Sequence, residues 1–206
     1  MRKETWSLVT IIPQTGWNIE AITAHCESQN AWDLADHLQI ISGGDIHKLQ
    51  AIFFSTLDSH CTHTIAKARG EEAWGITATM EKLLCSRYML MSSHPKCFEE
   101  TYRDLSRPQN VIQSMRILNQ TTDSFWRFCG DRSTDMNYYT KRGVLASVLG
   151  ATTYAWMKGM RNDQEIAQEV SKNLGYALAL GKIKKQTGKY FASLIVRGKT
   201  KIFNFF

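Results

Sequence analysis

The sequence predicts an all-α protein, and three observations lead to that prediction. Apolar residues recur at spacings of three and four along most of the 206 residues, which is the period of amphipathic helices. Alternating, strand-like runs are nearly absent. The composition, 43% hydrophobic and 21% charged, is that of a folded chain. A chain of this length can form one domain with a sizeable core, or at most two small ones.

Turn and cap residues divide this pattern into a bundle of about nine to ten helices. Gly16 and Asn30 separate the first three, and Gly43-Gly44 with Asp45 precedes the fourth. Pro108 can begin a helix and Gly159 can end one. We expect helices over 4–14, 18–28, 32–40, 45–69, 72–92, 108–128, 134–158, 163–181 and 183–203.

The cysteine content indicates a reducing compartment. There are five cysteines, an odd number, and no C-x-x-C motif. No signal or transit peptide is visible at Met1–Glu4. The uncharged stretch 143–157 is shorter than the roughly 18–20 residues that a membrane span requires. We therefore interpret this stretch as a buried core helix.

No pattern indicates catalysis, a cofactor or a metal site. His60 and His63 lie three residues apart, but no other Cys or His has zinc-site spacing to them. Gly43-Gly44 is a turn before a helix, not a phosphate loop. Small core residues are the more common role for the cysteines, although nucleophiles remain an alternative. We predict a protein that is not an enzyme and binds no metal.

The segment 130–142 is the most informative part of the sequence. It places many polar side chains and two adjacent tyrosines at the start of the uncharged helix. Ser133 or Asp131 can cap that helix, and Asp135 suits its dipole. In one interpretation these residues serve only as caps while both tyrosines pack inward. In the other, Asp135 and Tyr138 lie on one exposed helix side and contact a partner.

The residues over 125–146, including Trp126, closely resemble the signature of the ubiquinone (coenzyme Q) biosynthesis accessory family called Coq-nine. The segment 11–22 resembles the helix-turn entry of TetR domains and of this family. Three short helices followed by longer ones also fit a TetR-like fold. The sequence departs from the family at Tyr138, where tryptophan is common, and at Met136, where phenylalanine is common. The short N-terminus leads us to expect a bacterial member.

The resemblance implies a lipid-binding accessory protein of ubiquinone biosynthesis over 1–181. It would form a homodimer and present an isoprenoid quinone intermediate or another lipid to the di-iron demethoxyubiquinone hydroxylase, Coq-seven. The candidate partner-binding residues are Asp131, Ser133, Thr134, Asp135, Asn137, Tyr138 and Arg142. The candidate lipid-binding residues are Trp126, Tyr139, Leu145, Leu149, Met80 and Leu84.

The C-terminal segment 182–206 is predicted to be an amphipathic membrane-binding helix. From Val170 to Phe206 there are eight basic residues and no acidic one, interleaved with aromatic and aliphatic side chains. A terminal helix docked on the bundle is the alternative. We expect a cytoplasmic protein peripheral on an anionic inner membrane. The candidate membrane-binding residues are Lys185, Lys189, Tyr190, Phe191, Leu194, Ile195, Arg197 and Phe203.

A TetR-type transcriptional regulator with a small-molecule pocket is the alternative function. The net charge of +6 favours it, but the distribution of charge does not. The would-be recognition helix at 31–38 is acidic, whereas DNA binding requires lysine and arginine to neutralise phosphates. We therefore expect no nucleic acid partner. Six carboxylates and no lysine or arginine lie between positions 4 and 47: Glu4, Glu20, Glu27, Asp33, Asp36 and Asp45.

Overall fold

A computed structural model of the protein describes residues 3–70, 72–134 and 136–179. These residues form helices and no strands, so the predicted all-α class is confirmed. A final helix covers 163–179. The preceding elements are α1 (Lys3–Trp6), α2 (Leu8–Thr15), α3 (Ile19–Ser28), α4 (Trp32–Ser42), α5 (Ile46–Arg69), α6 (Ile76–Ser93), α7 (Pro95–Leu105), the 3-10 turn η1 (Pro108–Asn110), α8 (Val111–Phe128) and α9 (Met136–Met157).

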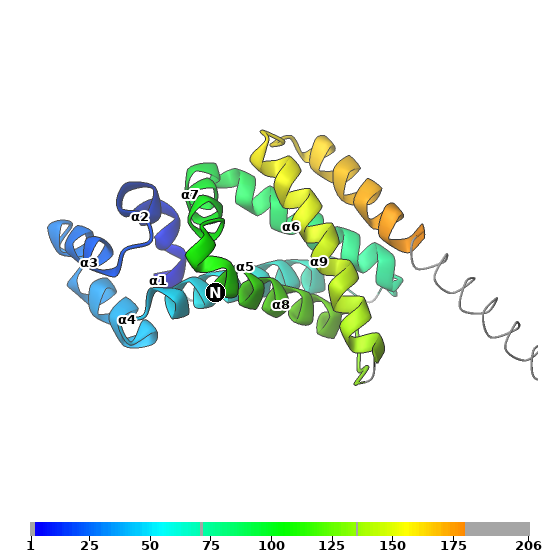
Figure 1. The fold of residues 1–206 in the computed structure, drawn as a ribbon, viewed down its shortest axis with the longest axis horizontal. Coiled ribbons are helices and arrows are strands. Elements are labelled where there is room, and N and C mark those ends of the chain that lie inside the picture. The colour runs from blue at the N-terminus through cyan, green and yellow to red at the C-terminus, as the bar shows by residue number, and fades with distance from the viewer. Residues whose placement is uncertain (1–2, 71, 135, 180–206) are drawn as a thin grey trace, which may run out of the picture.

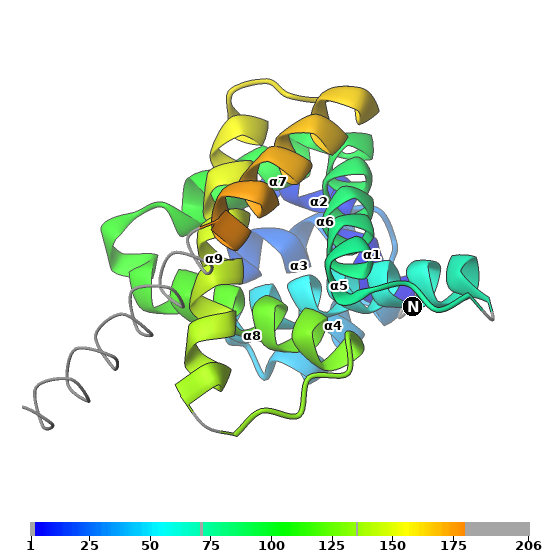
Figure 2. The same cartoon turned by 90° about the vertical axis from the view of Figure 1, so that its right-hand side faces the viewer.

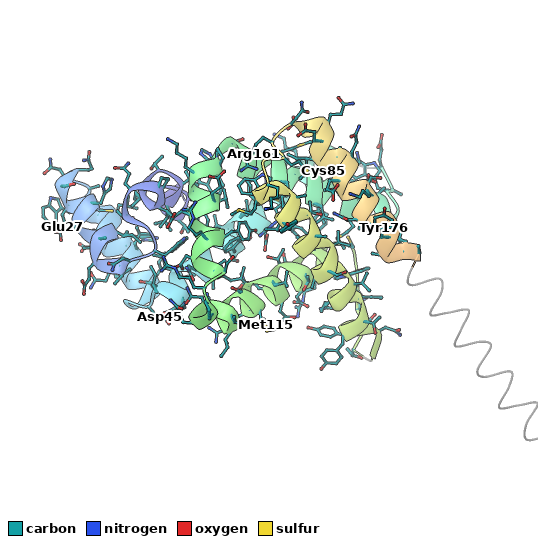
Figure 3. All side chains as sticks on the ribbon, turned by 45° about the horizontal axis from the view of Figure 1, so that its top comes forward. Glu27, Asp45, Cys85, Met115, Arg161 and Tyr176 are labelled. Carbon is teal, nitrogen blue, oxygen red and sulfur yellow. The ribbon has the colours of Figure 1, made fainter. Side chains whose placement is uncertain are left out.

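The helices form two groups along the long axis of the molecule. Helices α1 to α4 lie at one end, and α6, α8, α9 and the helix 163–179 form the larger group at the other (Figure 1). Helix α5 runs between the groups and packs against α4, α6 and α8 (Figures 1 and 2). Figure 3 labels Glu27 and Asp45 in the first group and Cys85, Arg161 and Tyr176 in the second.

The core is built from large apolar side chains that α5 shares with its neighbours. Phe53 and Phe54 of α5 are fully buried, as are Phe98 of α7 and Trp156 of α9. The rings of Phe53 and Phe98 lie 5.5 Å apart, which is within the range of favourable aromatic contacts. Burying each such ring contributes roughly 1.5–3 kcal/mol. This packing fixes the position of α7 against α5.

The helix ends follow the expected turn chemistry. Asn18 accepts a hydrogen bond from the amide of Ala21 at the start of α3, and Asp45 accepts one from His47 at the start of α5. Gly43 ends α4 with a φ of 62°, in the left-handed region where glycine carries no Cβ penalty. Pro108 opens η1, as predicted.

Three predicted boundaries were wrong. No helix was predicted between 92 and 108, whereas α7 begins there at Pro95, a residue well suited to the first turn of a helix. The expected helix 4–14 is two helices that divide at Ser7. The expected helix 72–92 begins at Ile76, after Gly75.

Two of the sequence predictions fall outside the described residues. They are the amphipathic helix 183–203, with its membrane-binding side chains, and the role of Asp135. Within the described part of the chain, no helix is long and apolar enough to cross a membrane.

Candidate functional site

A cluster of charged side chains joins α8 to the start of α9, with Arg142 at its centre. Arg142 is 5% exposed. Its Nε and Nη2 donate to Oδ1 of Asp123 at 2.9 and 2.6 Å, and its Nη1 donates to Oδ2 of Asp131 at 3.2 Å. The guanidinium also lies 3.4 Å from the ring centroid of Tyr138. A buried cation held by two carboxylates and an aromatic ring is fully compensated.

Asp131 anchors the loop before α9. It accepts hydrogen bonds from Lys141 Nζ at 2.6 Å and from the Ser133 hydroxyl at 2.7 Å. Lys141, with Ser133 and Arg142, holds the pKa of Asp131 far below its usual range. Burial alone would raise the pKa of Asp123, but the hydrogen bonds from Arg142 and Tyr138 and the positive charges of Arg127 and Arg142 together outweigh it, so the pKa is lowered. Both carboxylates are therefore ionised at neutral pH.

The two adjacent tyrosines have different environments. Tyr138 is half-buried and its hydroxyl donates to Asp123 at 3.2 Å. Tyr139 is 69% exposed, and its ring meets that of Tyr138 edge-on. The indole of Trp126 donates to the backbone carbonyl of Lys141 at 3.0 Å, which fastens α8 to α9.

The structure places the candidate partner-binding residues in two layers. Asp131 and Arg142 are buried in the cluster, and Ser133 and Tyr138 are half-buried beside them. Thr134 and Asn137 are exposed, together with Tyr139, which was assigned to lipid. A partner that docks here can therefore reach only the outer layer, and partner binding itself stays a prediction.

A second site is a pocket of about 240 Å³ enclosed by α6, α7, α8 and α9. Its lining is mainly apolar. Buried residues form its floor, and exposed Ser106 and Gly150 lie at its mouth. The lining residues are Arg87, Tyr102, Leu105, Ser106, Ser114, Ile117, Leu118, Thr121, Leu149, Gly150 and Thr153. A mainly apolar concave site with a few polar groups is the usual form of a small-molecule site.

The floor of this pocket carries a buried ion pair. Arg87 donates from Nη1 to Asp58, and both side chains are at most 3% exposed. Asp58 also accepts from the Thr121 hydroxyl at 2.7 Å. Burial raises the pKa of Asp58, an effect that Arg87 and Thr121 partly offset. Among the described residues, no acceptor faces the Nε of Arg87.

A hydrogen-bonded chain joins α6 to α9 at the side of the pocket. The hydroxyl of Tyr88 donates to the Leu149 carbonyl at 2.9 Å and lies 2.8 Å from the Thr153 hydroxyl. Tyr88 is fully buried. These contacts tie α9 to α6 beside two lining residues of the pocket, Leu149 and Thr153.

Of the candidate lipid-binding residues, Leu149 lines the pocket. Leu145, Met80 and Leu84 are buried in the core, and Trp126 and Tyr139 belong to the polar cluster described above. The sequence analysis did not predict that residues of α8 line the pocket, although their spacing of three and four indicated one face of a helix. These residues are Ser114, Ile117, Leu118 and Thr121. The α7 wall could not be expected without the helix 95–105.

The described residues were searched for a metal-binding site and for nucleophilic cysteines. They contain no group of three or more His, Cys, Asp or Glu that could hold a metal. Burial raises the pKa of the Cys61 and Cys97 thiols to about 12, and that of Cys85 to about 11. Thiols with such pKa values are weak nucleophiles at neutral pH.

Comparison with known proteins relates the chain to one family. Residues 111–173 match the COQ9 family model. The chain is 24% identical over 194 residues to "Ubiquinone biosynthesis protein COQ9, mitochondrial" of Bos taurus, covering 91% of this chain and 60% of the bovine protein. It is 23% identical to the Homo sapiens protein, with the same coverage of each chain. Over 80 residues it is 30% identical to COQ9-B of Xenopus laevis, covering 38% of this chain and 27% of that protein.

The chain thus spans about 60% of the length of the mammalian proteins it matches. The family match covers α8, the polar cluster, α9 and residues 163–173 of the helix 163–179. It includes the segment 130–142, whose residues carried the resemblance in the sequence. That resemblance is thereby confirmed, and the chain is similar to the COQ9 proteins.

Proposed function

We propose that the protein is a lipid-binding accessory protein of ubiquinone biosynthesis. Its relatives carry that pathway in their names, and the matched residues include two walls of the pocket. The pocket itself is the observation that carries the proposal, because its mainly apolar lining suits a hydrocarbon ligand. In this role the protein binds an isoprenoid quinone intermediate and needs no catalytic residue of its own.

The size of the pocket limits how much lipid it can hold. A protein cavity of about 150 Å³ holds one benzene molecule. The volume here, about 240 Å³, therefore accommodates one substituted ring or a short piece of chain. Most of a polyprenyl tail must lie outside the pocket, on another surface of the protein or in a membrane. A peripheral position on an anionic membrane, held by 182–206, is part of the proposal.

The outer layer of the polar cluster is the proposed contact for the demethoxyubiquinone hydroxylase. Tyr139 is the exposed aromatic side chain there, and tyrosine is a frequent anchor of protein interfaces. Arg142 lies against the ring of the adjacent Tyr138 and ties the start of α9 to α8 through Asp123. A transcriptional regulator remains less well supported, because Asp33 and Asp36 are exposed on α4, where a recognition helix would meet phosphates.

The proposal is tested by lipid extraction from Gly150→Phe. Gly150 is exposed at the mouth of the pocket, and a Cβ added there meets no heavy atom of another element within 4 Å. The larger side chain can cover the mouth without disturbing the fold. Mass spectrometry of organic extracts should find a quinone, isoprenoid or phospholipid with the wild type and several-fold less with the variant.

Gly143→Phe is the matched control. Gly143 is also exposed on α9, two helical turns earlier, and does not line the pocket. This variant should retain the lipid content of the wild type. Extracts that contain no lipid from any of the three proteins would reject the proposed function. Equal lipid in all three would place the lipid elsewhere on the protein.

A further inference from the structure

Helix α4 presents a face to solvent that no other described element covers. Its exposed side chains follow one side of the helix at spacings of three and four. Trp32 is 56% exposed and Ile40 is 77% exposed, so two large apolar side chains lie on this face. Tryptophan is among the residues most favoured as anchors of protein interfaces. We call this surface the α4 face; it consists of Trp32, Asp33, Asp36, Gln39 and Ile40.

The carboxylates of α3 and α4 lack cationic partners. None of the ion pairs among the described residues involves either helix, and the acidic members all lie in α5 or in residues that follow it. Asp33 lies in the first turn of α4, where it suits the helix dipole, but Asp36 lies beyond that turn. The α4 face therefore carries negative charge that the described part of the protein does not neutralise. The exposed carboxylates of the two helices are Glu20, Glu27, Asp33 and Asp36.

The opposite charge is concentrated in the sequence 182–206, which lies outside the described residues. This segment contains seven lysine or arginine residues and no aspartate or glutamate. Aromatic residues such as Tyr190 and Phe191 are interleaved with the bases. The segment therefore complements the α4 face twice, because its lysines can pair with free carboxylates and its apolar side chains can cover Trp32 and Ile40.

The shape of the molecule favours a contact between two copies. Figure 1 shows the end of the helix 163–179 at the opposite end of the long axis from α3 and α4. To reach α4 of its own copy, the segment 182–206 would have to extend back along the whole molecule. A chain extended in this way has few residues left to lie on α4. The same segment of a neighbouring copy can approach α4 without this constraint.

We propose that the α4 face is a docking surface for the basic segment 182–206 of a second copy of this chain. Such a contact is heterologous, because two different surfaces meet, and it can therefore link copies into rings or chains. The contact requires no lipid in the pocket, so it stands apart from the proposed function. One set of lysines cannot contact α4 and an anionic membrane at the same time, so self-association competes with membrane attachment.

Salt dependence is the first measurement, made by sedimentation equilibrium on the full chain. Exposed charges are screened far more strongly at about 500 mM salt than at about 50 mM. The wild type should associate at the lower salt concentration, and its association constant should be at least about tenfold smaller at the higher one. Absence of association at low salt, or equal association at both concentrations, overturns the inference.

Asp36→Lys/Gln39→Lys changes the charge of the α4 face. Both positions are exposed and lie beyond the first turn of α4, and lysine is a good helix former, so the fold should be kept. The association constant at low salt should fall about tenfold, because attraction is replaced by repulsion. Association as strong as that of the wild type would show that the α4 face is not the docking surface.

Glu165→Lys/Gln168→Lys is the matched control. It makes the same two exchanges at the same spacing, at exposed positions of the helix 163–179. Its net charge changes by the same amount, but the α4 face stays intact. The control should associate as strongly as the wild type. An equal loss in both double variants would mean that net charge alone governs association, and the proposed docking surface would be wrong.

Mixing two defective variants distinguishes a contact between copies from one within a copy. Lys184→Glu/Lys185→Glu should weaken association about as much as the α4 variant does. In a mixture of the two, the intact segment of one chain can meet the intact α4 face of the other. The mixture should therefore associate at least about fivefold more strongly than either variant alone. A mixture that associates no better than its components overturns the inference, because mixing cannot restore a contact within one copy.

Discussion

Two buried arginines in this protein lie in polar clusters of opposite character. Arg142, at the start of α9, donates to two carboxylates and to the carbonyl of Tyr138, and it stacks on the Tyr138 ring. Arg87, at the floor of the pocket, donates to one carboxylate and has a donor without an acceptor among the described residues. Among the described residues, Arg142 finds its hydrogen-bond partners within the protein, whereas one donor of Arg87 has none.

This difference bears on how much each cluster stabilises the fold. A fully satisfied network fixes the geometry of the elements it joins, and any ligand would have to displace an existing bond. An incompletely satisfied group gains from a ligand that supplies the missing partner. The cluster around Arg142 therefore supports the start of α9, whereas Arg87 keeps an unpaired donor among the described residues.

The largest effect is expected from Arg142→Ala. Removing this side chain leaves Asp123 and Asp131 without their shared partner, which should lower the free energy of unfolding by about 3–5 kcal/mol. For a chain of this length the melting temperature should fall by roughly 10 °C. Urea unfolding measures the effect, with Arg132→Ala as a control at an exposed arginine of the same loop. Equal stability of the two variants would show that the cluster is not structural.

Acid should also weaken the cluster around Arg142. The pKa values of Asp123 and Asp131 are lowered in the folded state. Their contribution is therefore complete above the ordinary carboxyl pKa of about 4 and is lost as the pH falls toward the folded-state values. The difference in unfolding free energy between the wild type and Asp131→Asn should shrink between pH 6 and pH 3.

Asp36→Asn is the control for this acid effect, because Asp36 is an exposed carboxylate on α4, remote from the cluster. If the free energy of unfolding of the wild type exceeds that of Asp131→Asn by the same amount at every pH from 6 to 3, the lowered pKa assigned to Asp131 is wrong.

The smallest effects should distinguish the two adjacent tyrosines. Tyr138→Phe removes one hydrogen bond to Asp123 but keeps the ring beneath Arg142, so the loss should be about 1 kcal/mol. Tyr139→Lys changes an exposed side chain and should alter stability by less than about 0.5 kcal/mol. Pull-down of the demethoxyubiquinone hydroxylase should weaken with Tyr139→Lys. If Tyr139→Lys captures as much hydroxylase as the wild type, Tyr139 is not part of the proposed contact.

Helix content and most helix ends could be predicted from local sequence. The period of apolar residues and turn residues such as Gly43 and Pro108 act over a few neighbours, so they can be recognised without tertiary information. Helix α7 shows where such reasoning failed. No helix was predicted after Pro95, although the buried residues Cys97, Phe98, Thr101 and Leu105 recur with a helical period behind it.

The sequence by itself determined the all-α class and the relation to the COQ9 proteins, because helical period and the residues of 125–146 are properties of the linear chain. Only the tertiary structure decided which polar residues meet. Arg142 and Asp123 are 19 residues apart, and Arg87 and Asp58 are 29 apart, on different helices. Such pairs depend on how helices pack, and no local pattern records that arrangement. The pocket follows the same rule, because its walls come from four helices that only folding brings together.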